Sequence, residues 1–370
     1  PVDWTGILPS GATTARVDLP TYAFDHRHYW LRTARTATDA TSLGQTAVDH
    51  PLLGAMVRLP HSDGLVFTSR LSLTAQPWLG DHLVGGVVVL PGTALTELAV
   101  RAGDEAGCGV LEELVTDTPL VLPEQGGVRV QVAVGAPDEN GSRTLEIYSQ
   151  REDAPGDGDA WTRHATGTLS PAPSARPADF DFAVWPPAGA EAVGIEDFYT
   201  ELAEQGDEYG PAFRGVRAVW RRGDEIFAEV ALPEEQREDA ARFAIHPALL
   251  DAALHAHTLG GATAGDHAAR RPLDWNGLVL HAVGASALRV RLRPGGPGLL
   301  ALEAADETGG PVVTADSVAM RELTAERLAN AGDAAAPDAL FGVEWTGLPS
   351  GRGPVAVPSW VPVAAAEDIT

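Results

Sequence analysis

Apolar and polar residues alternate in several short runs along this 370-residue chain, and this spacing is typical of β-strands with one buried face. Early runs lie at Gly64–Leu73, Val128–Val134 and Arg143–Ser149, and the last two flank Asn140-Gly141, a dipeptide that favours a hairpin turn. A later series comprises Asp224–Leu232, Ala287–Arg293, Leu299–Ala304 and Val312–Met320. The pattern therefore predicts two groups of antiparallel strands.

Each group of strands contains one segment in which apolar residues recur with helical spacing. Pro91 opens the first segment, "GTALTELAVRAG", and Pro247 opens the second, "ALLDAALHAH". Both groups thus have the same order of strands, a proline-led helix and further strands. This order predicts an α+β class with an internal repeat, and it suggests a sheet wrapped around a buried helix, occurring twice.

Turn-rich and Pro/Ala-rich stretches divide the chain. One runs from Ser170 to Ala190 and another begins near Ala329, while the first 45 residues hold the aromatic string "LPTYAFDHRHYWL" and read as a connector. We therefore expect a connector at 1–45 and folded blocks at 46–170 and 191–325. Linkers are expected at 171–190 and 326–370.

Composition limits the classes of function. A net charge of −25 repels nucleic acids and anionic membranes, and no apolar run approaches the roughly 18 residues that span a bilayer. All 26 basic residues are arginine, which excludes Schiff-base chemistry and lysine-dependent phosphate loops, and no dinucleotide fingerprint is present. Cys108 is the single cysteine, which suits a reducing cytoplasm. We expect no bound cofactor, no nucleic-acid partner and no membrane partner.

Two titratable positions stand out in apolar surroundings. His82 precedes the apolar run of "DHLVGGVVVLPGT", while Asp251 and His255 are four residues apart and so share one helix face. If the two blocks pack as equivalent units, His82 and Asp251 meet at their interface. Burial would then lower the pKa of the histidine and raise that of the aspartate. A neutral imidazole and a protonated carboxyl suit proton removal beside a carbonyl and donation to a departing hydroxyl.

Two further questions concern the proline-led helical segments: whether the second one holds a metal, and what role Gly92 has in the first. His246, Asp251, His255 and His257 together suggest a metal site, but His246 precedes the helix and His257 faces away, so we expect no metal. Gly92, after Pro91, either donates its N–H to a developing oxyanion at a helix N-terminus or simply begins a helix.

Four ordered motifs resemble the dehydratase domains of bacterial modular type I polyketide synthases. "HLVGGVVVLP" contains His82, Gly86 and Pro91 at the spacing of one family signature, and "HPALLDAALH" contains Asp251 and His255 at that of another. "YGPAF" (Tyr209–Phe213) and "PLDWNGLVLHA" (Pro272–Ala282) resemble the remaining two. The chain departs from the family motifs at Asp207, Arg271 and Leu273, and we expect these departures to affect substrate fit more than catalysis.

The resemblance implies a double hotdog fold and roles for particular residues. It implies that His82 is the general base, that Asp251 is the acid, and that the supporting residues are Tyr209, His255, Gly92, Pro91 and Gly86. Candidates for the substrate channel are Pro211, Phe213, Leu273 and Trp275, although a turn at Tyr209 and a structural tryptophan are the plainer alternatives.

The same resemblance implies a reaction and partners. A β-hydroxyacyl thioester on the phosphopantetheine arm of an acyl carrier protein would lose water, with Arg270-Arg271 as the candidate contact for that acidic carrier. Residues 1–45 resemble the linker after an acyltransferase domain, and 326–370 the start of a ketoreductase region, with a homodimer expected. The alternatives are a non-catalytic scaffold domain and a double-bond isomerase or cyclase of the same fold.

Overall fold

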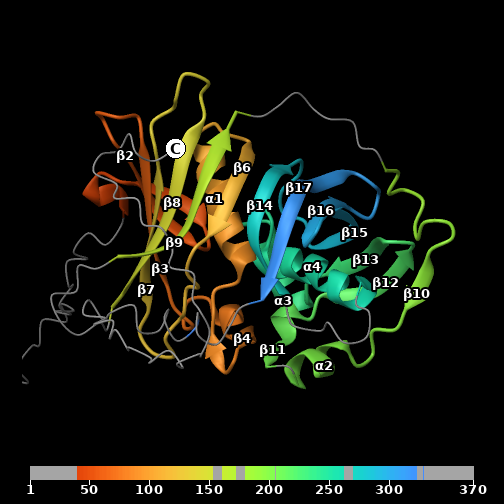
Figure 1. Ribbon diagram of the computed structural model, residues 1–370. Helices are drawn as coiled ribbons and strands as arrows, with labels where there is room; N and C mark the ends of the chain where they lie inside the picture. Colours follow the sequence, from red (N-terminus) through yellow and green to blue (C-terminus); the bar gives the residue numbers. More distant parts are fainter. Residues whose placement is uncertain are drawn as a thin grey trace, which may run out of the picture.

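The computed structural model describes residues 40–152, 161–171, 180–204, 206–261, 270–322 and 328, which form two halves lying side by side (Figure 1). The strands of the first half in the main sheet are β1 (Thr46–His50), β2 (Leu53–Arg58), β3 (Leu65–Leu71), β6 (Val110–Thr116), β7 (Val128–Val134), β8 (Arg143–Arg151) and β9 (Thr162–Ser170). Those of the second half are β10 (Glu191–Val193), β12 (Val216–Arg222), β13 (Glu225–Ala231), β14 (Arg270–Leu280), β15 (Ala287–Gly296), β16 (Leu299–Ala305) and β17 (Pro311–Glu322). The connectors expected before residue 40 and after residue 328 lie outside the described residues.

A single antiparallel sheet runs through both halves of the described chain. Its 14 strands have the order β1-β2-β3-β7-β8-β9-β6-β14-β17-β16-β15-β13-β12-β10. Strands β6 and β14 pair at the centre, with Leu114 opposite Trp275. Outward from β6 the first half has β9, β8, β7, β3 and β2, and outward from β14 the second half has β17, β16, β15, β13 and β12. Strands at equal distance from the seam therefore follow the same order along the chain in both halves. This order confirms the internal repeat that the hydrophobic pattern predicts, and the Asn140-Gly141 hairpin is confirmed by the pairing of β7 with β8.

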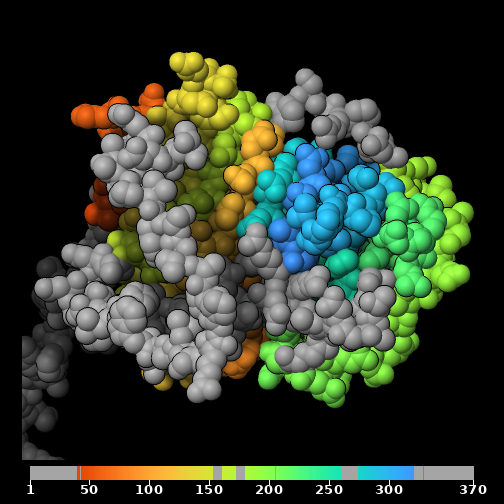
Figure 2. Space-filling model, viewed as in Figure 1, coloured from red at the N-terminus to blue at the C-terminus, as the bar shows by residue number. Residues whose placement is uncertain are grey.

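One long helix lies at the centre of each half. In α1 (Gly92–Glu105) every residue from Thr93 to Val100 is buried, and in α4 (Pro247–Gly261) every residue from Ala248 to Ala256 is buried. A helix that is buried on all sides belongs to the core, and the main sheet wraps around both helices (Figure 1). Figure 2 shows the outside of the same two halves, which lie side by side. The predicted double hotdog is thus confirmed.

Shorter elements complete the described structure. A second, three-stranded sheet has the order β11-β4-β5 and consists of β4 (His82–Val84), β5 (Val87–Val88) and β11 (Asp207–Tyr209). The remaining helices are α2 (Phe198–Glu204), α3 (Glu234–Ala240) and the 3-10 turns η1 (Ala40–Leu43), η2 (Pro77–Asp81) and η3 (Pro211–Phe213). No helix within the described ranges is long and apolar enough to cross a membrane.

The described end of the predicted linker at 171–190 packs against the outer face of the second half. Strand β15 alternates buried leucine and valine with arginine, so its arginines project from the face opposite the core. Arg291 lies 4.6 Å from the centroid of the Phe180 ring, and Arg289 donates a 2.9 Å hydrogen bond to the carbonyl of Phe182. The aromatic residues of this linker therefore cover the sheet.

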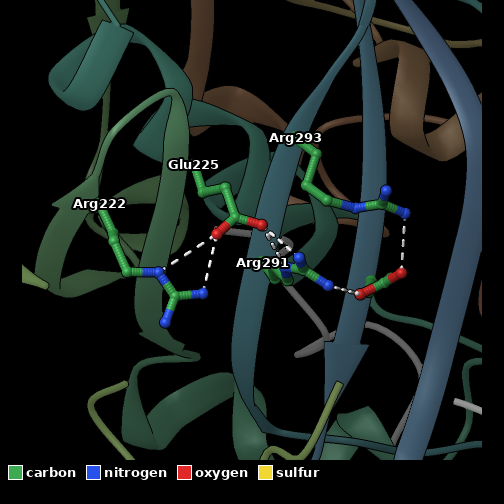
Figure 3. A network of polar contacts seen from close by, with 5 residues as sticks. Arg222, Glu225, Arg291 and Arg293 are labelled. Carbon is green, nitrogen blue, oxygen red and sulfur yellow. Dashed lines mark hydrogen bonds and ion pairs between the residues drawn. The ribbon is translucent and has the colours of Figure 1, made fainter. Parts of the chain in front are cut away.

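Ion pairs tie the strands together beside this aromatic cover. The carboxylate of Glu225 on β13 accepts hydrogen bonds from Arg222 and Arg291 (Figure 3). Arg291 also donates to Glu303 on β16 at 3.1 Å, and Arg293 donates to the same carboxylate at 2.9 Å (Figure 3). The arginines alternate with carboxylates across neighbouring strands, so positive and negative charges balance on this part of the sheet.

The small sheet joins the two halves a second time. Strand β4 of the first half pairs with β11 of the second, and the neighbouring residue Asp81 reinforces this contact. The carbonyl of Asp81 accepts from the N–H of Gly210 at 2.7 Å, and its carboxylate accepts from the N–H of Ala212 at 2.8 Å. A Cβ on Gly210 would lie 2.3 Å from Cγ of Asp81, so this position requires glycine.

Replacing Gly210 with alanine tests this contact between the halves. Because the added Cβ would overlap Asp81, we expect the free energy of unfolding to fall by about 1–3 kcal/mol, the usual effect of overpacking. Urea denaturation measures the change. Gly80→Ala is the control, since a Cβ there meets no atom within 4 Å. Equal stability of the two variants would contradict the proposed tight contact.

Candidate active site

His82 is the first residue of β4 and is only 2% exposed. Its Nδ1 lies 2.7 Å from the carbonyl oxygen of Val89. A carbonyl oxygen can only accept, so Nδ1 carries the proton and donates it, which leaves the lone pair of the neutral ring on Nε2. The backbone thus selects the tautomer in which Nε2 can act as a base.

A glycine turn brings the Val89 carbonyl back to the histidine. Gly85 and Gly86 join β4 to β5 and have φ values of +56° and +80°. Two consecutive residues of positive φ form the hairpin turn that glycine favours. Gly86 is therefore explained by backbone conformation, because a Cβ there would meet no atom within 4 Å.

Tyr209 on β11 lies directly opposite His82 on β4. The two ring centroids are 5.6 Å apart, and the Tyr209 ring is also 4.3 Å from that of His255 on α4. Tyr209 is 6% exposed, and its carbonyl accepts a 2.7 Å hydrogen bond from Arg214. This tyrosine therefore links the histidine of the first half with the central helix of the second.

Asp251 and His255 lie one turn apart on α4, as the sequence predicts. His255 Nε2 is 3.1 Å from Asp251 Oδ2, and the two side chains are 10% and 6% exposed. Since Tyr209 contacts both His82 and His255, the structure brings His82, Tyr209, Asp251 and His255 into one buried cluster. Their individual roles stay predictions.

Tyr199 on α2 borders this cluster. It was not identified from the sequence. Its hydroxyl donates to the carbonyl of Phe213 and accepts from the N–H of Val216, both at 3.3 Å, and its ring lies 6.0 Å from that of His255. Burial raises the pKa of Tyr199 far above its ordinary value, and the nearby carboxylate of Asp251 acts in the same direction. The tyrosine therefore stays protonated. Only its place in a short amphipathic helix marks it in the sequence.

The proline and glycine of the first motif lie at the start of α1. Pro91 occupies the N-cap with an extended backbone, and Gly92 is the first helical residue. The N–H groups of a first turn have no partner within their own helix, and they favour negative charge. Both predicted possibilities for Gly92, an oxyanion donor and a plain helix start, fit this position.

The four channel candidates are placed very differently. Phe213 is fully buried and its ring lies 5.2 Å from that of His82, whereas Pro211 begins η3 and is exposed. Trp275 is 1% exposed at the seam between the halves, and its indole N–H has no hydrogen-bond partner among the described residues. The side chains of Leu273 and of the neighbouring Arg270 and Arg271 lie outside the described part of the chain. Asp207, one of the three positions at which the chain departs from the family motifs, is buried on β11 opposite Val84.

His246 begins the turn before α4 and caps it. Its carbonyl accepts from the N–H groups of Leu249 and Leu250, and its Nδ1 accepts from the N–H of Ala248 at 3.2 Å. The ring packs against Trp78 with centroids 4.9 Å apart. Within the described ranges no three His, Cys, Asp or Glu side chains are grouped to hold a metal ion. The geometry thus gives His246 a structural role.

Comparison with known proteins shows which family this chain resembles. A family model described as a polyketide synthase dehydratase domain matches residues 50–150, and one described as a polyketide synthase dehydratase N-terminal domain matches residues 177–330. The chain is 51% identical over 347 residues to the pikromycin polyketide synthase component PikAII of Streptomyces venezuelae, which covers 93% of this chain and 9% of that protein. The chain thus spans less than a tenth of the length of this curated relative.

Solved structures resemble the described fold. The dehydratase domain from the terminal module of the rifamycin polyketide synthase is 59% identical with a TM-score of 0.72, and the match covers 76% of this chain and all of that domain. A bifunctional dehydratase-cyclase domain in ambruticin biosynthesis is 42% identical with a TM-score of 0.68, covering 75% of this chain and 99% of that one.

The burial of His246 predicts a pH dependence of stability. Burial lowers the pKa of His246 from 6.5 to about 3, so the folded state keeps this ring neutral where the unfolded chain would protonate it. The stability linked to His246 is therefore complete above about pH 6.5 and is lost as the pH falls toward 3. By pH 4 the loss is expected to reach about 3 kcal/mol.

His246→Asn is the matched variant, because an asparagine oxygen can still accept from the N–H two residues on but does not titrate. Urea unfolding of both proteins between pH 4 and pH 7.5 measures the difference. The variant should be the less stable protein at pH 7.5, and the gap should narrow as the pH falls. Parallel stability curves would show that His246 is not kept neutral by the fold.

Proposed function

This chain belongs to the family of polyketide synthase dehydratase domains, and from that premise we propose that it removes water from a β-hydroxyacyl thioester. The observation that carries the proposal is the buried cluster of His82, Tyr209, Asp251 and His255, in which Tyr209 connects a histidine of one half with the His255–Asp251 pair of the other. A base and an acid on opposite sides of one site suit elimination of water.

In the proposed reaction His82 is the base. Its Nε2 takes the proton from the carbon next to the thioester carbonyl, while the Nδ1–H stays bonded to the carbonyl of Val89. The electron pair of the broken C–H bond forms the α,β-double bond. The N–H of Gly92 at the start of α1 stabilises the negative charge that develops on the thioester oxygen.

Asp251 is the acid of the same reaction. It gives its proton to the β-hydroxyl, the C–O bond breaks, and one water leaves with the oxygen. His255, 3.1 Å from the carboxyl group, orients Asp251, and the Tyr209 ring packs against His255. The proton that His82 gained replaces the one that Asp251 lost, so the products are water and an α,β-unsaturated thioester without any net proton change.

The proposal extends to partners. The substrate would be held on the phosphopantetheine arm of an acyl carrier protein, with acyltransferase and ketoreductase domains adjoining in one polypeptide. The match to a small part of a longer polyketide synthase component supports this context. A homodimer, a cytoplasmic location and a reaction without a bound cofactor remain predictions.

Mass spectrometry of a β-hydroxyacyl carrier protein incubated with the purified domain tests the activity. Loss of one water would support dehydration. An unchanged substrate would favour the scaffold alternative, while an isomer of equal mass or a ring-closed product would favour the isomerase or cyclase alternative.

Two substitutions test the assigned roles. His82→Ala and Asp251→Asn should each lower the dehydration rate on the order of a hundredfold to ten-thousandfold, the range for losing a positioned base or acid. Because the two groups act together, the double variant should be scarcely slower than either single one. The wild-type rate should follow a bell-shaped pH profile that belongs to the coupled pair.

The exposed residues His61 and Asp224 supply matched controls. His61→Ala and Asp224→Asn should keep the rate within about twofold of wild type, since neither lies in the buried cluster. Folded His82 or Asp251 variants that dehydrate as fast as these controls would refute the assignment.

A further inference from the structure

Glu97 is a carboxylate at the centre of the protein that the proposed reaction does not use. It lies in the middle of α1, and its side chain is 0% exposed. Neighbouring residues of the helix such as Leu95 and Leu98 belong to the hydrophobic core. Burying a carboxylate is unfavourable unless hydrogen-bond donors surround it, so this residue needs specific partners.

Three donors surround the Glu97 carboxylate. Oε1 accepts from the N–H of Ala244 and lies 2.8 Å from His50 Nε2, while Oε2 accepts from the N–H of Ile245, each bond again 2.8 Å long. His50 Nδ1 accepts from the N–H of Leu52 at 3.1 Å, so the ring proton is on Nε2 and points to Glu97. Both oxygens of the carboxylate therefore act as acceptors.

The two backbone donors lie at a critical place in the second half. Ala244 and Ile245 immediately precede His246, α4 begins at Pro247, and Asp251 follows within the first turns of that helix. Ile245 is fully buried and forms a parallel bridge with Ala285, so the segment is confined on its other side too. Glu97 therefore binds the backbone directly before α4.

The first half of the candidate site is tied to the same helix that carries Glu97. Gly92 begins α1 five residues before Glu97, a rise of about 7.5 Å along a helix axis. Val89, whose carbonyl holds His82, lies three residues before Gly92. One rigid helix thus connects the residues around the proposed base with the carboxylate that binds the start of α4.

We propose that Glu97 is a positioning residue for dehydration, which holds the start of α4 so that Asp251 keeps its distance from His82 across the two halves. This inference rests on the proposed function for its activity readout. Glutamine has nearly the same shape but replaces one accepting oxygen with an NH2 group. In either amide orientation at least one N–H of residues 244–245 or of His50 would face another donor, so the contact should loosen without leaving a cavity.

Glu97→Gln tests the proposal by two measurements. Hydrogen–deuterium exchange should speed up at least tenfold in the segment 243–251 but not in β7 at Val128–Val134, because only the former loses its bond to residue 97. With a β-hydroxyacyl pantetheine thioester, kcat should fall about tenfold to a hundredfold while KM changes less than about threefold. A displacement of catalytic groups by about 1 Å has effects of this size.

Ser149→Ala is the matched control for general loss of stability. Ser149 is buried on β8 in the first half and shares a 2.7 Å hydrogen bond with His164, away from α4. Both variants are assayed at a temperature where circular dichroism shows each to be folded. The control should keep kcat within about twofold and leave exchange in 243–251 unchanged.

Each outcome decides the matter. Faster hydrogen–deuterium exchange confined to 243–251, together with a loss of kcat in Glu97→Gln that the control does not show, supports the positioning role. Wild-type kcat in a folded variant overturns it, and so does a loss of kcat that the control matches. If the wild-type domain dehydrates no β-hydroxyacyl thioester, the proposed function fails and the role in dehydration fails with it. Exchange in 243–251 would then still show whether Glu97 holds α4.

Discussion

The candidate site depends on the pairing of β4 with β11, because this contact places a residue of one half opposite a residue of the other within the cluster. His82 and Tyr209 are direct partners in that pairing. Asp81 secures it by accepting from the backbone of Gly210 and Ala212, and the absence of a side chain on Gly210 lets the two segments approach. Neither half has both the base and the acid, so the proposed chemistry exists only where the halves meet.

The buried titratable groups show how a largely apolar core can hold such chemistry. Helices α1 and α4 are enclosed on all sides, yet α1 carries Glu97 and α4 carries Asp251 and His255. Three hydrogen-bond donors surround the Glu97 carboxylate, which is the condition for burying it without a large penalty, whereas Asp251 and His255 approach each other to 3.1 Å. Packing against several fixed partners also leaves these side chains few alternative positions, as a site for proton transfer requires.

Part of the segment that joins the halves covers the outer face of the second half. Aromatic residues of the segment 180–190 lie on Arg289 and Arg291 of β15, and the Glu225 and Glu303 carboxylates neutralise Arg291. A composition rich in proline and alanine suggested only a linker there. The segment does connect the halves, but its aromatic side chains also shield one side of the sheet from water.

Residues close in the sequence determined much of this protein. Alternation and helical spacing predicted the two central helices, their repetition and the strands β3, β7, β8, β13, β15, β16 and β17, since these depend on the period of burial along each element. The strands β6 and β14, which pair at the centre of the sheet, were not predicted. The four-residue spacing of Asp251 and His255 likewise established that they share a helix face, and the family resemblance singled out His82. Only the tertiary structure decided that Tyr209 stands opposite His82, that Tyr199 borders the cluster, and that Glu97 binds a backbone N–H 147 positions away. Such contacts join segments distant in the chain, and a hydrogen bond to a backbone N–H demands no particular side chain from its donor, so it leaves no pattern in the sequence.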